Sequence, residues 1–171
     1  MKTLCLLRHA KSAWDDAGLS DHDRPLAPRG IVAAGLVGRY LKEHGVRPDL
    51  VLCSTARRAV ETFELLTEAM GDAPPAEYDE GLYLTGAPAL LERIRTAPDS
   101  AGTLMLVAHN PDLHALGTRL AERDGSKRLR SLQEKFPTGA CAILAFEAAH
   151  WRDVAPGTGR LVDFVLPRAL A

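Results

Sequence analysis

Five short apolar runs recur along the chain, each of a length that suits a β-strand. They are Thr3–Leu7, Leu50–Cys53, Thr103–Ala108, Ala140–Phe146 and Leu161–Val165. None of them alternates cleanly between polar and apolar positions. Continuous apolar runs are typical of strands that are covered on both faces, so the pattern predicts a sheet that lies between layers of helices.

The segments between these runs carry helical spacing, with apolar residues three and four positions apart. Such stripes predict helices from Pro28 to Gly45, from Ala59 to Gly71, from Ala87 to Ile94 and from Leu113 to Leu120. Because strand and helix alternate, the predicted class is α/β, a three-layer α/β/α sandwich with a mostly parallel central sheet. The polar and basic segment Asp124–Thr138 has no clear pattern and is expected to be a loop or a short helix.

Composition narrows the class of protein. The 171 residues are expected to form a single domain, 1–171, without repeats, and a core of that size needs no disulfide or structural metal. With 21 Lys and Arg against 22 Asp and Glu, the net charge is −1, and 46% of the residues are hydrophobic. These values exclude a disordered chain and a basic protein that coats nucleic acid, so no nucleic-acid partner is expected.

The cysteines and the apolar runs also bear on location. Cys5, Cys53 and Cys141 are odd in number and lie inside apolar stretches, which argues against a disulfide framework and favours a reducing, cytoplasmic setting. No apolar run approaches the roughly 20 residues of a membrane span, and no signal peptide is expected. We therefore expect a cytoplasmic protein with no membrane partner.

Three predicted strands end in polar residues that suit an anion. Arg8 and His9 follow the first run, Ser54 and Arg58 the second, and His109 the third. Ligands of open α/β sheets bind outside the carboxyl ends of the strands, so these segments should converge if the strands are neighbours. Guanidinium groups bind phosphate oxygens through a planar fork of donors, and free N–H groups at the following helix starts add to the field. The set predicts a site for a phosphoryl group.

Each of these residues also has a structural interpretation. A single His after a strand is more often structural than functional, Ser54 could simply cap the following helix, and Arg57 or Arg58 could belong to a solvated helix face. For the chemistry, adjacent guanidinium charges should keep His9 neutral and nucleophilic, while a protonated His109 could donate to a phosphate oxygen. The joint pattern at three strand ends favours the functional interpretation.

Competing signatures are absent or weak. The chain has neither a phosphate-binding P-loop nor a dinucleotide fingerprint. Only four residues separate Cys53 from Arg58, whereas the thiol phosphatase loop needs five. Asp21, His22 and Asp23 are interpreted as a solvated turn rather than a metal site, so no metal is expected.

Three segments resemble the histidine phosphatase superfamily, which has the phosphoglycerate-mutase-like fold. Leu7-Arg8-His9-Ala10-Lys11-Ser12-Ala13-Trp14-Asp15 is similar to its L-R-H-G-E-S-x-W-N opening, with Ala10, Lys11 and Asp15 departing from the pattern. Ser54-Thr55-Ala56-Arg57-Arg58-Ala59-Val60-Glu61-Thr62 is similar to its S-x-x-x-R-A-x-x-T segment, which selects Arg58 over Arg57. Ala108-His109-Asn110 is similar to the segment of its second His. The similar segments extend to about Gly139.

This resemblance implies a covalent phosphohistidine mechanism without metal or cofactor. His9 would accept the phosphoryl group, Arg8, Arg58 and His109 would hold its oxygens with help from Ser12, and water would release phosphate. Glu80, in a segment similar to the mutase E-R-x-Y, is the candidate proton donor, although it could equally be an exposed loop carboxylate.

Within the superfamily, the short chain most resembles the SixA-type phosphohistidine phosphatases, which act on phosphorylated histidine in proteins. The implied partner is therefore a phosphorylated protein. Two alternatives stay open: a phosphomonoesterase or mutase acting on a small phosphorylated metabolite through the same site, and a non-catalytic module that only binds phosphate.

Overall fold

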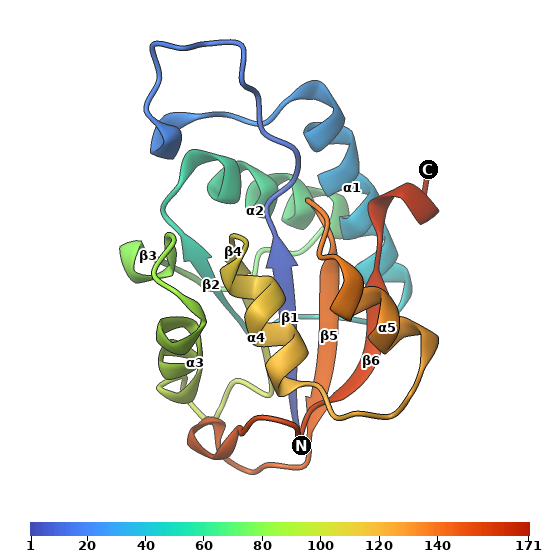
Figure 1. Ribbon diagram of the computed structural model, residues 1–171. Helices are drawn as coiled ribbons and strands as arrows, with labels where there is room; N and C mark the ends of the chain where they lie inside the picture. Colours follow the sequence, from blue (N-terminus) through green and yellow to red (C-terminus); the bar gives the residue numbers. More distant parts are fainter.

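A six-stranded sheet forms the centre of the molecule, in a computed structural model that describes residues 1–171 (Figure 1). Its strands lie in the order β3-β2-β4-β1-β5-β6. They are β1 (Lys2–Arg8), β2 (Leu50–Ser54), β3 (Ala76–Asp79), β4 (Thr103–Ala108), β5 (Cys141–Phe146) and β6 (Arg160–Val165). Only β5 runs against its neighbours β1 and β6, so the expectation of a mostly parallel sheet is confirmed.

Five helices cover the two faces of this sheet. They are α1 (Pro28–Glu43), α2 (Arg57–Met70), α3 (Ala87–Arg95), α4 (Asp112–Leu120) and α5 (Lys127–Glu134). One core unites α1 and α2 with one face of the sheet, and a second core unites α3, α4 and α5 with the other. In Figure 1, α4 and α5 lie in front of the sheet. The predicted three-layer sandwich is confirmed.

The central strand β1 shows why its apolar run is continuous. Leu4 and Leu6 belong to the core shared with α3, α4 and α5, whereas Cys5 and Leu7 belong to the core shared with α1 and α2. All four side chains are 0% exposed. Successive side chains of a strand point to opposite faces, so a strand covered on both faces must be apolar at every position.

Two glycines let α1 lie close to its neighbours. A Cβ atom on Gly30 would stand 2.2 Å from the carbonyl oxygen of Lys11, and one on Gly38 would stand 2.5 Å from that of Leu66. Real Cβ contacts are never this short, so any side chain at either position would push the elements apart. Gly30 thereby holds the start of α1 against the backbone that follows β1.

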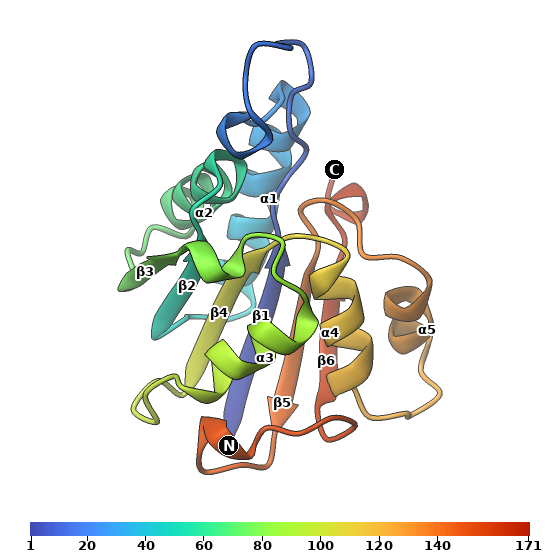
Figure 2. The same cartoon turned by 60° about the vertical axis from the view of Figure 1, so that its left-hand side comes forward.

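The long connection between β1 and α1 projects beyond the carboxyl ends of the parallel strands in both views (Figure 2). It contains a short 3₁₀ turn at Asp21–Asp23, and its two ends are joined by a bridge between Ser12 and Leu26. Three further 3₁₀ turns occupy Glu80–Leu82, Trp151–Asp153 and Pro167–Ala169. None of the helices has the length and apolar character needed to cross a membrane.

Two elements of the fold were not specified by the apolar pattern of the sequence. Strand β3 at the edge of the sheet was not expected. Helix α5 lies inside the segment 124–138, where a loop or short helix was expected, and the Ser126 hydroxyl caps it by accepting from the N–H of Leu129.

Candidate active site

The three polar strand ends lie side by side. Strand β4 pairs with both β1 and β2, and the register places Arg8 opposite Ala108 and Cys53 opposite Val107. The residues that follow these positions therefore share one edge of the sheet, as expected for parallel neighbours.

A cavity of about 250 Å³ opens at this edge. It is lined by Arg8, His9, Lys11, Ser12, Trp14, Arg24, Arg58, Leu84, His109, Asn110 and Thr138. Four of these side chains are Lys or Arg, and none is Asp or Glu. The charge of the lining favours an anion.

His9, directly after β1, is 6% exposed and has a defined tautomer. Its Nδ1 lies 2.7 Å from the carbonyl oxygen of Ala10. A carbonyl oxygen can only accept, so Nδ1 carries the proton and Nε2 keeps its lone pair. Burial lowers the pKa of His9 to about 3, with smaller contributions from the charges of Arg58 and Arg8. The imidazole is thus neutral at pH 7, but burial outweighs the guanidinium effect that the sequence suggested.

His109, after β4, lies close to His9, with 5.1 Å between the ring centroids. Burial, then the neighbouring His9 and Arg58, lowers its pKa to about 3. His109 is therefore neutral at pH 7 in this structure, and its protonation against a bound phosphate stays a prediction. A phosphoryl dianion in the cavity would raise this pKa again, because an adjacent negative charge favours the imidazolium.

Ser54 contacts His109 rather than capping the next helix. Its Oγ lies 2.8 Å from Nε2 of His109. Helix α2 begins at Arg57, and Ala56 occupies the cap position, so Ser54 is not the cap residue. Because its hydroxyl contacts the ring, Ser54 fixes the orientation of His109.

The two neighbouring arginines of α2 have separate surroundings. Arg58 is 3% exposed and lines the cavity. Arg57 is exposed and forms a surface ion pair with Glu61 one helical turn later. The structure therefore places Arg58, and not Arg57, at the site.

Asp21 joins the site, although the sequence suggested only a solvated turn. Its carboxylate accepts from Arg24 at 2.9 Å, from Arg58 at 3.0 Å and from the hydroxyl of Tyr83. The Tyr83 hydroxyl and the two guanidinium groups hold the pKa of Asp21 well below its usual range. Asp21 lies in an exposed turn, as the sequence suggested, but its ionised carboxylate also fixes two arginines, which the sequence did not predict. The spacing of Asp21 and Arg24, three residues apart in a short polar turn, was the only signal in the sequence.

Further hydrogen bonds hold Arg8 and Arg24. Arg8 donates to the carbonyl oxygen of Phe136 at 2.9 Å, and Arg24 donates to the hydroxyl of Ser12 at 2.8 Å. Ser12 is thus brought to the site and orients Arg24. The Nε atoms of Arg8 and Arg58 are buried without a partner. Two buried donors beside the cavity are thus left unsatisfied within the protein.

Glu80 is not brought into the cavity. It lies in the 3₁₀ turn Glu80–Leu82, is exposed, and is absent from the cavity lining. Its role as a proton donor stays a prediction. Asp15 is also exposed and outside the lining.

Cys53 has no part in nucleophilic chemistry. Its side chain is 0% exposed at the end of β2, and burial raises the pKa of the thiol to about 12. The thiolate is the reactive form of cysteine, so this residue is inert at neutral pH. No group of three His, Cys, Asp or Glu side chains is placed to hold a metal ion. The groups at the cavity that can bind an anion are the imidazoles and cations already described.

Comparisons with known proteins agree with this geometry. The sequence profile of the histidine phosphatase superfamily (branch 1) matches residues 4–83, a span that contains His9, Asp21, Arg24 and Arg58. An uncharacterised protein of Mycobacterium tuberculosis is 46% identical over 164 residues, which cover 95% of this chain and 100% of that protein.

Two solved structures are also similar over nearly the whole chain. A candidate phosphohistidine phosphatase SixA from Nakamurella multipartitia has 31% identity and a TM-score of 0.84, covering 97% of this chain and 96% of its own. A candidate phosphohistidine phosphatase SixA from Agrobacterium tumefaciens has 30% identity and a TM-score of 0.80, covering 97% of this chain and 98% of its own.

Proposed function

We propose, since this chain belongs to the histidine phosphatase superfamily, that it is a phosphatase in which Nε2 of His9 accepts the phosphoryl group, and that its substrates are proteins phosphorylated on histidine. The similarity to SixA proteins supports a hydrolase that acts on phosphorylated substrates. The observation that carries the proposal is the hydrogen bond from Nδ1 of His9 to Ala10, because it leaves a lone pair on Nε2 beside Arg8 and Arg58.

The reaction proceeds in two displacements. Nε2 of His9 attacks phosphorus while the phosphorus–nitrogen bond of the substrate breaks, and the substrate imidazole, already protonated on its other ring nitrogen, leaves in its neutral form. Water then attacks the phosphohistidine of the enzyme, the N–P bond breaks, and inorganic phosphate leaves as His9 returns to its neutral form. Arg8, Arg58 and His109 donate to the phosphoryl oxygens in both steps, where fixed donors stabilise the transition state.

The character of the cavity favours a phosphorus–nitrogen bond as the target. An alkoxide leaving group needs a strong general acid, whereas an imidazole leaves readily once its ring is protonated. The cavity lining has no carboxyl group, and the Tyr83 hydroxyl and two arginines hold the pKa of Asp21 well below its usual range, so Asp21 has no proton to donate. This combination supports phosphohistidine over phosphate esters as the preferred substrate.

The test compares substrates on one enzyme preparation. We expect kcat/KM for a phosphohistidine peptide to exceed that for the matched phosphoserine peptide and for a sugar phosphate by about 100-fold. The reason is that the lack of a general acid in the cavity slows the cleavage of esters but not that of phosphohistidine. The His9→Ala variant serves as the background. A large preference for the sugar phosphate would overturn the choice of substrate and favour a small-molecule phosphomonoesterase or mutase.

A further inference from the structure

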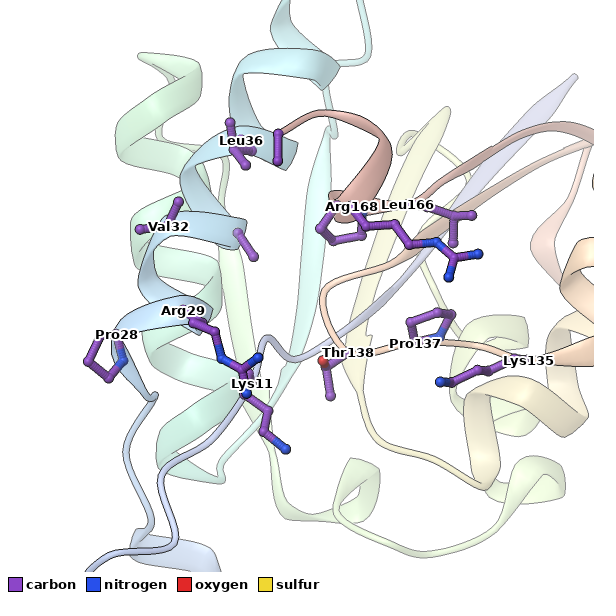
Figure 3. Close-up of a pocket in the computed structure, with 13 residues that line it drawn as sticks. Lys11, Pro28, Arg29, Val32, Leu36, Lys135, Pro137, Thr138, Leu166 and Arg168 are labelled. Atoms are coloured by element: carbon purple, nitrogen blue, oxygen red, sulfur yellow. The ribbon is translucent and has the colours of Figure 1, made fainter.

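A second and larger cavity lies next to the catalytic one. This groove encloses about 760 Å³ between the start of α1, the segment that precedes β5 and the chain that follows β6 (Figure 3). Lys11 and Thr138 line both the groove and the catalytic cavity. Lys11 and Thr138 thus lie at the boundary between the two cavities, so a ligand in one is next to the other.

The walls of the groove combine apolar surface with unpaired positive charge. Val32, Leu36 and Leu166 contribute the apolar part, and Val32 is 63% exposed. Four cations line it, namely Lys11, Arg29, Lys135 and Arg168, and no Asp or Glu does. Figure 3 shows Lys11 and Arg29 on one side and Lys135 and Arg168 on the other.

The four groove cations have no carboxylate partner beside them. None of them forms an ion pair, whereas Arg24, Arg58 and Arg93 are each paired with a carboxylate. The chain as a whole has a net charge of −1, so the clustering does not reflect an excess of basic residues. Like charges gathered on one surface repel each other, and an anionic occupant relieves that repulsion.

We propose that the groove binds an acidic, partly apolar segment of the phosphorylated partner protein, beside the phosphohistidine that enters the catalytic cavity. Carboxylates of this segment meet the four cations, and its apolar side chains pack on Val32 and Leu36. The assignment of the partner rests on the proposed function, but the charge and shape of the groove do not.

Two observations favour a protein segment over a small molecule. The groove is about three times as large as the catalytic cavity, and its cations stand on both sides of it, so several separated negative charges are matched at once. On the catalytic cavity itself, Trp14 and Leu84 are 70% and 49% exposed. The apolar contact surface thus continues beyond the groove, as the docking of a protein requires.

The first experiment measures binding without catalysis. A fluorescein-labelled peptide of alternating Glu and Leu residues, carrying no phosphate, is titrated with the protein and followed by anisotropy. We expect the triple variant Arg29→Glu, Lys135→Glu, Arg168→Glu to bind at least about tenfold more weakly than the wild type, because attraction becomes repulsion.

A charge-matched control excludes a general effect of net charge. The triple variant Arg39→Glu, Arg123→Glu, Arg152→Glu changes three exposed residues that form no ion pair and do not line the groove. Its affinity for the peptide should stay within about twofold of the wild type. Equal binding by both triple variants, or no binding by the wild type, would overturn the proposal.

The second experiment measures turnover. The wild type should hydrolyse a phosphohistidine peptide with Glu and Leu flanks about tenfold more efficiently than one with Gly and Ser flanks, and the groove variant should lose this preference while keeping its rate on para-nitrophenyl phosphate. Equal efficiency of hydrolysis of the two phosphohistidine peptides would overturn the groove proposal and leave the proposed function intact. A wild type that is inactive on phosphohistidine, yet binds the acidic peptide through the groove, overturns the proposed substrate alone. If the wild type, but not the groove variant, hydrolysed hexyl phosphate more efficiently than methyl phosphate, the groove would bind a small amphiphile and the proposed protein segment would be wrong.

Discussion

The catalytic cavity and the adjoining groove are both lined by cations, but they hold them in different ways. In the cavity, Arg58 is 3% exposed and its guanidinium is fixed by Asp21. In the groove, Arg29 and Arg168 are exposed and contact no carboxylate. Fixed donors stabilise a charge that develops at one point, whereas mobile surface charges attract a partner and tolerate variation in its shape. Burial and hydrogen bonding, rather than residue type, thus separate the chemistry of this protein from its recognition.

The largest effect is expected in the cavity itself. His9→Ala removes the phosphoryl acceptor, so kcat for a phosphohistidine peptide should fall by about 1,000-fold or more. Binding of the acidic peptide to the groove should not change, because His9 does not line it. A variant that keeps wild-type turnover would show that another residue accepts the phosphoryl group.

The second largest effect is expected when the residue that holds the cavity arginines is changed. Asp21→Asn removes the charge that holds Arg24 and Arg58, so their donors lose alignment, and kcat/KM should fall by about 10- to 100-fold. The phosphoenzyme should still form, since His9 is intact. Asp23→Asn is the matched control, because Asp23 lies in the same 3₁₀ turn but contacts only Ser20 and His22. Equal losses in both variants would show that the turn, and not the Asp21 clamp, is what matters.

Burial of the two imidazoles makes a prediction about stability. The pKa values of His9 and His109 are about 3 in the folded protein, against about 6.5 in the unfolded chain. The unfolded state therefore binds more protons below pH 6.5, so stability is complete above that pH and is lost as the pH falls. Between pH 7 and 5 each histidine should contribute a loss of roughly 2 kcal/mol in the free energy of unfolding.

Chemical denaturation at the two pH values measures this loss. The double variant His9→Asn, His109→Asn should show a shallower dependence on pH than the wild type. Identical slopes for the two proteins would mean that the imidazoles are not held neutral by the fold.

The next and smaller expected effect is that of salt, which should weaken binding in the groove but hardly change turnover in the catalytic cavity. Raising the ionic strength from about 50 to about 300 mM should weaken binding of the acidic peptide about fivefold or more, because exposed charges are screened. Turnover of para-nitrophenyl phosphate should change by less than about twofold, since the arginines of the cavity are buried or half-buried. An equal response of binding and turnover would remove the distinction between fixed and mobile cations.

The smallest effect is expected outside both regions. Glu80 is exposed and lines neither the cavity nor the groove. Glu80→Gln should therefore change kcat/KM for a phosphohistidine peptide by less than about threefold. A loss of 100-fold would show that Glu80 moves into the cavity during turnover and donates the proton.

Local sequence predicted the elements that are buried on two faces. Strands β1, β2, β4 and β5 follow continuous apolar runs, and this pattern requires cover on both sides. Strand β6, at the edge opposite β3, was also predicted from its apolar residues, but its Val162 is exposed and Asp163 interrupts the run. Strand β3 lies at the edge of the sheet, and its segment Ala76–Asp79 is partly or fully exposed, so no apolar run marks it. The reversed direction of β5 depends on its connection and cannot be read from its own residues.

The sequence predicted the part of the site that is formed by residues at the ends of strands. Arg8, His9 and His109 directly follow parallel strands or end them, so the topology of the sheet alone brings them together. Asp21 reaches Arg58 across 37 positions of the chain, through a projecting connection whose path no local pattern encodes. The neutral state of His109 depends on how deeply the ring is buried, which also becomes visible only in the folded molecule.

The proposed role of His9 as phosphoryl acceptor is tested by identifying the atom that becomes phosphorylated. Wild-type protein is mixed with a ³²P-labelled phosphohistidine peptide, quenched in alkali, which preserves phosphohistidine, and the labelled residue and nitrogen are determined. Because Nδ1 of His9 is engaged with Ala10, we expect label on Nε2 of His9 and on no other atom. Label on Nδ1, label on another residue, or turnover without any labelled enzyme would contradict this expectation.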